Sequence, residues 1–142
     1  MNNPNNQNNP LVERLLKQKI KPTTIRLLVL KCILDRKEVF SLSDLENELD
    51  TVDKSNIFRT LKIFNKQGLI HSIDDGSGSL KYSICEEDCT CALYQLHVHF
   101  YCRACKQTYC FRDIPIPLIQ IPDGFSTDSA NYVIKGLCNN CN

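Results

Sequence analysis

The sequence predicts an α+β fold, with helices in the first half of the chain and short strands in the second. Apolar residues recur with the 3.6-residue period of a helix up to Gly68, and they follow the alternating pattern of strands beyond it. Eight of the nine cysteines lie between Cys85 and Cys141, a density typical of a small unit held together by a bound metal. The 142 residues, 42% apolar and 23% charged, suit one compact domain or two small ones.

The two halves also differ in charge, although the net charge is only +1. Residues 1–72 carry twelve basic and eight acidic side chains, whereas residues 73–142 carry five and eight. This difference indicates separate roles for the two halves. No run approaches about 18 apolar residues, and no charged segment followed by an apolar one opens the chain. We therefore expect a cytoplasmic protein with no membrane partner.

Four helices are expected before Gly68. Residues 1–10 are Asn-rich and have no apolar anchor, which predicts a disordered tail. The first helix begins at Leu11 and its apolar run ends at Ile20. The expected N-caps of the other three are Thr23 or Thr24, Ser41 or Ser43, and Ser55.

The fourth helix and the residues after it have the pattern of a DNA-binding unit. Ile57, Leu61 and Phe64 are expected to face the core. The side chains expected to point outward are Arg59, Thr60, Lys62 and Lys66. Two strands, 69–73 and 80–84, then flank a turn with the sequence DDGSGS. Helices followed by a hairpin are the order of a winged helix-turn-helix, although a small helical bundle with a hairpin has the same pattern.

The second half is predicted to contain three strands, at residues 97–102, 107–111 and 131–137. Between the last two, the sequence IPIPLIQIP contains Pro115, Pro117 and Pro122. Prolines interrupt helical hydrogen bonding, so this segment can hold a short helix at most.

Two Cys-x2-Cys pairs are the most specific motif in the chain. Cys102 and Cys105 form one pair, Cys138 and Cys141 the other, and 32 residues separate them. A two-residue gap lets both sulfurs of a pair reach one ion, and two pairs complete a tetrahedral zinc site without an open position. We expect one structural zinc per chain; redox-active pairs or unliganded core thiols are the alternatives.

A second, looser set of metal-ligand residues surrounds the first pair: Cys85, Cys89, Cys91, His97, His99 and Cys110. His97 and His99 are two residues apart on a predicted strand, so both side chains lie on one face. Imidazole and thiolate together favour zinc over iron(II). The alternative is a set of buried cysteines and surface histidines with no metal.

Four segments, in this order, make the chain resemble the ferric uptake regulator (Fur) superfamily of metal-responsive repressors. They are KPTTIRLLVLKCIL, SNIFRTLKIFNKQGLI, HVHFYCRAC and KGLCNNC. The resemblance implies a winged-helix DNA-binding domain at 11–84, a hinge or insert loop at 85–96 and a zinc-bound α/β dimerisation domain at 97–142. The residues it implies at the DNA are Arg26, Ser55, Asn56, Phe58, Arg59, Thr60 and Lys62. Lys62 and Lys66 fit phosphate contacts or an ordinary solvated face.

The chain departs from the family pattern at the regulatory metal site. Val98 replaces an aspartate, Val39 a hinge histidine and Cys110 a carboxylate ligand. Ala130 and Pro117 replace the remaining ligands of a further site, which we expect to be absent. The resemblance is therefore greater to the zinc-uptake branch. The ligands it implies are Cys85, His97, His99 and Cys110, with Cys89 as the alternate and Cys91 matching by spacing alone.

The function that the resemblance implies is transcriptional repression controlled by a second, regulatory divalent metal, expected to be zinc. The metal-loaded homodimer would bind a pseudo-palindromic operator in double-stranded DNA. An iron or peroxide sensor of the same superfamily is one alternative. A thiol redox switch or a zinc-binding interaction module without DNA binding is another. No enzyme motif occurs in the sequence, so we expect neither catalysis nor a small-molecule substrate.

Overall fold

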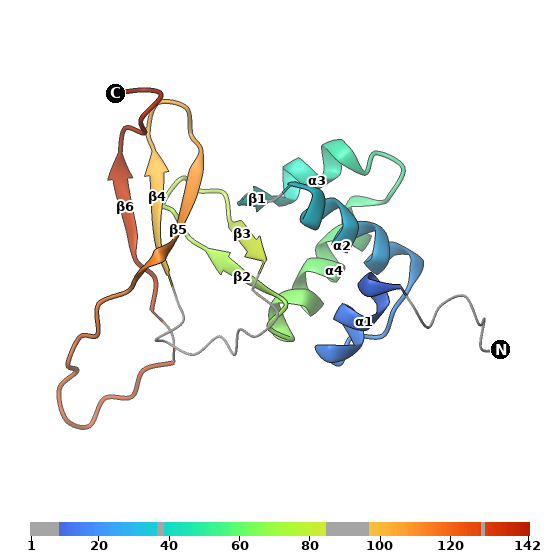
Figure 1. The fold of residues 1–142 in the computed structure, drawn as a ribbon, viewed down its shortest axis with the longest axis horizontal. Coiled ribbons are helices and arrows are strands. Elements are labelled where there is room, and N and C mark those ends of the chain that lie inside the picture. The colour runs from blue at the N-terminus through green and yellow to red at the C-terminus, as the bar shows by residue number, and fades with distance from the viewer. Residues whose placement is uncertain (1–8, 37–38, 85–96, 129) are drawn as a thin grey trace.

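The computed structural model describes residues 9–36, 39–84, 97–128 and 130–142. Residues 1–8 of the expected tail and the expected hinge at 85–96 lie outside the described residues. The prediction that the tail extends to residue 10 is wrong, because Asn9 caps the first helix and Pro10 begins it. Four helices and a first sheet are followed by a second sheet, which confirms the predicted α+β order (Figure 1). None of the described helices has the length and apolar character that spanning a bilayer requires.

The first helix, α1, spans Pro10–Lys17 and so begins one residue before the expected start at Leu11. The side-chain oxygen of Asn9 caps it, accepting a hydrogen bond from the Leu11 N–H at 3.0 Å. Pro10 suits the first helical position because its missing N–H would have no helical partner there. The Asn-rich composition around Asn9 concealed this cap.

The next helices are α2 (Thr24–Arg36), α3 (Leu42–Glu48) and α4 (Lys54–Lys66). Thr23 accepts the Arg26 N–H at 3.3 Å, as expected of a cap, and Ser41 forms a capping box with Asp44. The prediction that Ser55 caps α4 is wrong. The Asp53 carbonyl already accepts the N–H groups of Asn56 and Ile57, so the helix begins before Ser55.

The end of α4 lies where the sequence predicts it. Gly68 has φ 78°, a left-handed conformation that a residue without Cβ adopts at little cost. The Gly68 and Leu69 N–H groups donate to the carbonyls of Asn65 and Phe64 at 3.2 and 2.9 Å. This pair of bonds is a Schellman motif, and it turns the chain directly into the first sheet.

The first sheet contains β1 (Phe40–Ser41), β2 (Ile70–Ile73) and β3 (Lys81–Ile84) in the order β1-β3-β2. The β2–β3 hairpin is the predicted one. β1 was not predicted because two residues are too short to show a period. Its Phe40 pairs with Tyr82 on β3, and their rings stack with centroids 5.7 Å apart.

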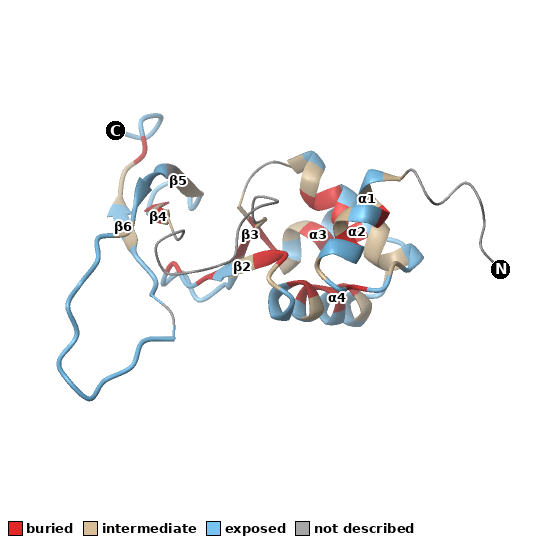
Figure 2. Cartoon of the chain, turned by 60° about the horizontal axis from the view of Figure 1, so that its bottom comes forward, coloured by how far each residue is buried: buried red, intermediate tan, exposed pale blue. Residues whose placement is uncertain are grey.

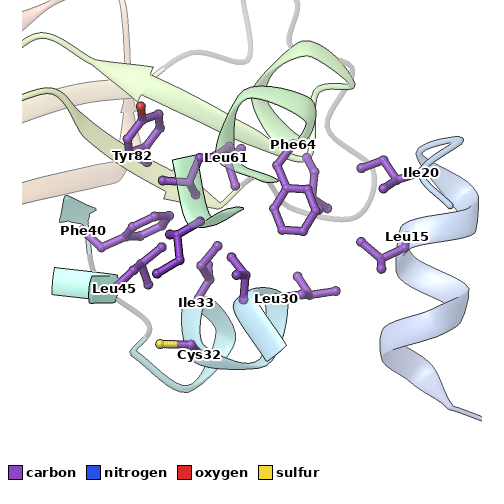
Figure 3. Close-up of a cluster of buried hydrophobic side chains, with 14 residues drawn as sticks. Leu15, Ile20, Leu30, Cys32, Ile33, Phe40, Leu45, Leu61, Phe64 and Tyr82 are labelled. Atoms are coloured by element: carbon purple, nitrogen blue, oxygen red, sulfur yellow. The ribbon is translucent and has the colours of Figure 1, made fainter. Parts of the chain in front are cut away.

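One hydrophobic core joins the four helices to this sheet (Figure 3). The side chains labelled in Figure 3 are Leu15, Ile20, Leu30, Cys32, Ile33, Phe40, Leu45, Leu61, Phe64 and Tyr82. Ile57, Leu61 and Phe64 are fully buried, as the helical period of α4 predicts. The hairpin and α4 are thus held as one unit by packing as well as by the short connection at Gly68.

The second sheet contains β4 (His97–Cys102), β5 (Thr108–Pro115) and β6 (Val133–Gly136) in the order β5-β4-β6. β4 pairs antiparallel with β5 and parallel with β6. The bounds of β4 are the predicted ones. β5 runs four residues further than predicted, to Pro115, because an irregularity between His97 and Val98 lets Pro115 pair with His97 at the sheet edge.

The long connection between β5 and β6 projects away from the two sheets and the helices (Figure 2). Its described residues form no helix, which agrees with the limit that Pro117 and Pro122 impose. Leu118, Ile119 and Phe125 are 84%, 74% and 73% exposed. The α/β domain that the resemblance implies at 97–142 therefore contains strands but no helix among its described residues.

Candidate metal centre and nucleic-acid interface

The structure brings together the four cysteines of the two Cys-x2-Cys pairs. Their sulfur atoms all lie within 4.8 Å of one another, and those of Cys105 and Cys138 are 3.9 Å apart. A tetrahedral ion with metal–sulfur bonds of about 2.3 Å separates its sulfurs by about 3.8 Å. A disulfide would need about 2.05 Å. The spacing therefore fits four thiolates around a single metal ion.

Strand register explains why two pairs so distant in sequence meet. Cys102 ends β4 and pairs with Gly136 at the end of the parallel strand β6, so both pairs emerge at the same end of the sheet. After Cys102 the chain turns through Lys106, whose φ is 63° and whose N–H donates to the Cys102 carbonyl. The Cys138 N–H donates to the Cys102 sulfur at 3.4 Å, which fastens the second turn to the first.

The electrostatics of the cluster favour thiolates and a cation. Backbone N–H groups, first that of Cys105, lower the pKa of Cys102. A hydrogen bond from the Tyr109 hydroxyl lowers the pKa of Cys138. The pKa of Cys141 is raised, mainly by its hydrogen bond to Cys138 and also by the other sulfurs nearby. Four thiolates this close repel one another, so all four ionise together only around a positive ion.

Tyr109 is a residue of this site that sequence analysis missed. It lies on β5 and is half-buried, and its hydroxyl reaches the sulfurs of Cys138 and Cys105. Those sulfurs raise the pKa of the tyrosine, so it stays a neutral hydrogen-bond donor. A tyrosine four residues after Cys105 is the available signal, but only the β4–β5 pairing shows that it turns back onto the cysteines.

The second predicted metal set is described only in part. Cys85 and Cys89, together with Cys91, lie outside the described residues. His99 on β4 and Cys110 on β5 are direct register partners, and His97 lies at the irregular end of β4. All three are half-buried. Within the described residues, only the four cysteines of the first site form a group of three or more metal-ligand side chains.

The outward face of α4 is basic and aromatic. Phe58, Arg59, Lys62 and Lys66 are exposed, with Phe58 at 45%, and they recur at the spacing of one helical face. The Lys62 ammonium lies over the Phe58 ring, 5.7 Å from its centroid. Among the described residues, no carboxylate forms an ion pair with Arg59, Lys62 or Lys66. The face therefore presents uncompensated positive charge.

The remaining residues of the predicted nucleic-acid surface differ in their placement. Thr60, predicted to point outward, is only 4% exposed, and its hydroxyl donates to the Asn56 carbonyl at 2.8 Å, so that prediction is wrong. Its β carbon falls on the buried side of the helix, next to Leu61. Ser55 is exposed and Asn56 half-buried on the first turn of α4. The half-buried Arg26 side chain donates to the Lys21 carbonyl at 2.8 Å.

Comparison with known proteins gives one family and many related folds. The model of the ferric uptake regulator family matches residues 17–123. No curated protein matches the chain. Among solved structures, a ferric uptake regulator from Pseudomonas aeruginosa with manganese has a TM-score of 0.64 at 17% identity, covering 92% of this chain and 99% of that one.

Two further structures show the same fold. A zinc uptake regulator complexed with zinc and DNA has a TM-score of 0.63 at 16% identity, with 90% of this chain and 87% of that one covered. A zinc-bound manganese uptake regulator has a TM-score of 0.62 at 16% identity, with 92% and 99% covered.

Proposed function

The chain belongs to the ferric uptake regulator family, and from this premise we propose that it is a zinc-responsive transcriptional repressor. Its metal-loaded homodimer binds a pseudo-palindromic operator, with one α4 helix in each of two successive major grooves. The observation that carries the proposal is the basic face of α4, next to a β-hairpin and on the same chain as a closed four-cysteine cluster. The solved zinc uptake regulator with zinc and DNA supports the same reading.

The chemistry of α4 suits DNA. Arg59 has the planar guanidinium that reads guanine edges, and Lys62 and Lys66 are placed one turn apart to contact phosphates. Phe58 offers an apolar edge for a thymine methyl group. Ser55 and Asn56 add polar groups at the helix start, and Arg26 a further cation. Thr60 supports the helix from its buried side and makes no base contact.

Zinc is the proposed metal at the four-cysteine cluster, one ion per chain. Four thiolates at tetrahedral spacing suit zinc, which has no redox chemistry and no geometric demand beyond four ligands. Because the protein fills all four positions, the ion there stabilises the fold and catalyses nothing. Tyr109 adds a hydrogen bond to the sulfurs from outside the ligand set.

A second, exchangeable zinc is proposed at His97, His99 and Cys110, together with Cys85 or, as the alternate, Cys89. Paired residues on adjacent strands have β carbons about 5 Å apart, which is close enough for His99 and Cys110 to share an ion. The thiolate of Cys110 in place of a carboxylate favours zinc over iron(II).

Repression then depends on the angle between the two winged helices of a dimer. Both α4 helices reach successive major grooves only when they are held about 34 Å apart in the correct orientation. The proposed ligands come from the hinge that follows the hairpin (Cys85 or Cys89) and from the second sheet (His97, His99 and Cys110), so a metal bound there can fix this orientation. Linkage requires operator DNA to tighten regulatory metal binding by the same factor as the metal tightens DNA binding.

The first test compares DNA affinity with and without the exchangeable metal. A duplex selected from a random DNA pool by the zinc-loaded protein serves as the probe. Protein that retains only the four-cysteine metal should bind it about 5- to 150-fold more weakly than fully loaded protein. Fluorescence anisotropy at one fixed salt concentration measures both affinities. Equal affinities would exclude metal-controlled DNA binding, and a response to iron(II) but not zinc would exclude zinc sensing.

The second test assigns the DNA-binding face. Arg59→Ala should weaken binding of loaded protein to the same duplex by about 5- to 150-fold, which corresponds to about 1–3 kcal/mol for a bidentate base contact. The matched control is Arg103→Ala, which removes an exposed arginine from the turn between β4 and β5. It should change the affinity by about twofold or less. If the two variants bind equally well, α4 is not the recognition helix.

A further inference from the structure

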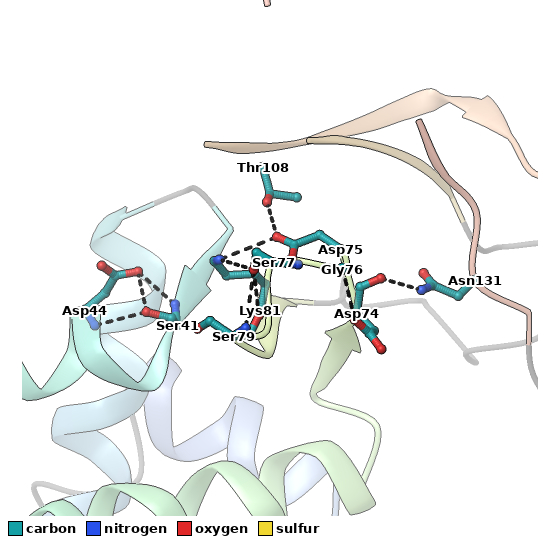
Figure 4. A network of polar contacts seen from close by, with 10 residues as sticks. All are labelled: Ser41, Asp44, Asp74, Asp75, Gly76, Ser77, Ser79, Lys81, Thr108 and Asn131. Carbon is teal, nitrogen blue, oxygen red and sulfur yellow. Dashed lines mark hydrogen bonds and ion pairs between the residues drawn. The ribbon is translucent and has the colours of Figure 1, made fainter. Parts of the chain in front are cut away.

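The turn between β2 and β3 carries a buried carboxylate that bonds to the second sheet (Figure 4). Asp75 is 0% exposed, and its Oδ2 accepts a hydrogen bond from the Thr108 hydroxyl on β5 at 2.7 Å. The Lys81 ammonium lies 3.4 Å from the same oxygen, and the Ser77 N–H donates to Oδ1 at 2.9 Å. Burial alone would raise the pKa of Asp75, but these donors outweigh it and lower the pKa to about 2.

Two more contacts hold the same turn against the second sheet. The Asn131 side chain, just before β6, donates to the Asp74 carbonyl at 2.9 Å. Gly76 lies so close to β6 that an added Cβ would be 2.3 Å from the Lys135 ammonium nitrogen. The turn thus contacts the second sheet at three residues: Thr108 on β5, Asn131 just before β6, and Lys135 on β6.

Strand register places these contacts beside the proposed regulatory ligands. Thr108 and Lys135 both pair with Tyr101, so the three residues form one row across the sheet. The row two residues away on β4 and β5 contains His99 and Cys110. Residues two apart on a strand share a face, so both rows lie on the same side of the sheet, about 7 Å apart along the strands.

We propose that the Asp75–Thr108 hydrogen bond is a latch that holds the β2–β3 hairpin on the face of the second sheet that contains His99 and Cys110, and that Asp75 is a positioning residue for α4. The hairpin follows α4 directly, and both share one core through Leu69 and Ile70. Whatever fixes the turn therefore fixes the DNA-binding helix relative to β4 and β5. The effect of the latch on DNA binding rests on the proposed function. Whether the latch exists can be tested without DNA.

The first measurement is amide hydrogen exchange of the full-length, metal-loaded chain. Thr108→Val removes the hydroxyl while keeping the shape of the side chain, and it should speed exchange in residues 74–81 by about tenfold or more, as expected for a lost bond to a buried charge. Thr108→Ser, which keeps the hydroxyl, should restore slow exchange. Asp74→Asn is the matched control: it removes the neighbouring charge, and the amide oxygen still accepts the Gly76 N–H.

A double-mutant cycle separates a latch from two independent effects. If the carboxylate and the hydroxyl act through one bond, Asp75→Asn together with Thr108→Val should speed exchange no more than the larger single effect. Effects that multiply would overturn the latch, as would fast exchange in Thr108→Ser or unchanged exchange in Thr108→Val.

The second measurement tests the role of the latch in signalling. Thr108→Val should reduce the ratio of zinc-loaded to stripped affinity for the selected duplex toward one, with the metal content of the four-cysteine cluster unchanged. An unchanged ratio would show that the latch does not position α4. If wild-type protein shows no metal-dependent DNA binding, the proposed function fails while the exchange result still decides whether the latch exists.

Discussion

Replacing Cys138 by serine is expected to abolish metal binding at the four-cysteine cluster and to unfold the second sheet. Among the described residues between 97 and 142, the buried hydrophobic ones are only Val98, Tyr101, Cys102 and Cys138. Two of these four are cluster cysteines, so little apolar core remains to stabilise β4, β5 and β6 without the ion. Structural zinc contributes about 10–16 kcal/mol of apparent binding free energy in zinc-finger peptides. The binding free energy lost with the ion is therefore larger than the stabilisation that so small an apolar core can provide.

Two measurements on the Cys138→Ser protein check this expectation. Elemental analysis should show the loss of about one ion per chain, and hydrogen exchange should show loss of protection in β4 and β6 while α2 and α4 keep theirs. Cys110→Ser is the matched control, because Cys110 is a half-buried cysteine of the same sheet outside the cluster. Since Cys110 is also a proposed ligand of the exchangeable metal, that metal is stripped from both variants first, and Cys110→Ser should then keep the cluster ion and its protection. The cluster is not a structural metal site if the Cys138 variant keeps both its ion and its protection.

Alanine substitution of the two phenylalanines on α4 should have very different effects on the free energy of unfolding. Phe64 is fully buried in the core below the helix, so Phe64→Ala should lower the free energy of unfolding by about 3–5 kcal/mol. Phe58 is 45% exposed and its ring contacts Lys62, so Phe58→Ala should change the free energy of unfolding by about 0.5 kcal/mol or less.

Urea titration of the metal-loaded proteins measures both free energies, and the selected duplex then separates stability from recognition. Phe58→Ala should weaken DNA binding while the protein remains fully folded. Phe64→Ala should lose binding in proportion to the unfolded fraction. Equal losses of stability in the two variants would mean that α4 does not present Phe58 to solvent and Phe64 to the core.

Local signals in the sequence predicted the local structure well. Ser41 and Thr23 cap their helices, Gly68 ends α4, and the bounds of β4 are the predicted ones. The two caps and the helix end depend on interactions between residues only a few positions apart, and the bounds of β4 follow from its own alternating pattern. Ser55 was assigned wrongly because cap preference identifies a residue type, whereas the backbone hydrogen bonds of Asp53 decide where the helix begins.

The amphipathic period was a less reliable guide to burial for residues at the border between the two faces of a helix. Thr60 is adjacent to the apolar stripe of α4, and a polar residue type suggested an exposed position. The structure buries Thr60. Its hydroxyl can be buried without cost from a missing partner, because it donates a hydrogen bond to the Asn56 carbonyl of the same helix. A threonine can therefore sit on the buried side of a helix without a partner from another element.

The sequence by itself determined the order of elements, the two Cys-x2-Cys turns and the basic face of α4, because these depend on spacing within single segments. Only the tertiary structure decided which distant groups meet. The parallel pairing of β4 with β6 joins Cys102 to Cys138, and the hairpin turn brings Asp75 to Thr108, 33 residues further along the chain. Such contacts depend on the register of whole strands and on how sheets pack, and no short motif encodes either one.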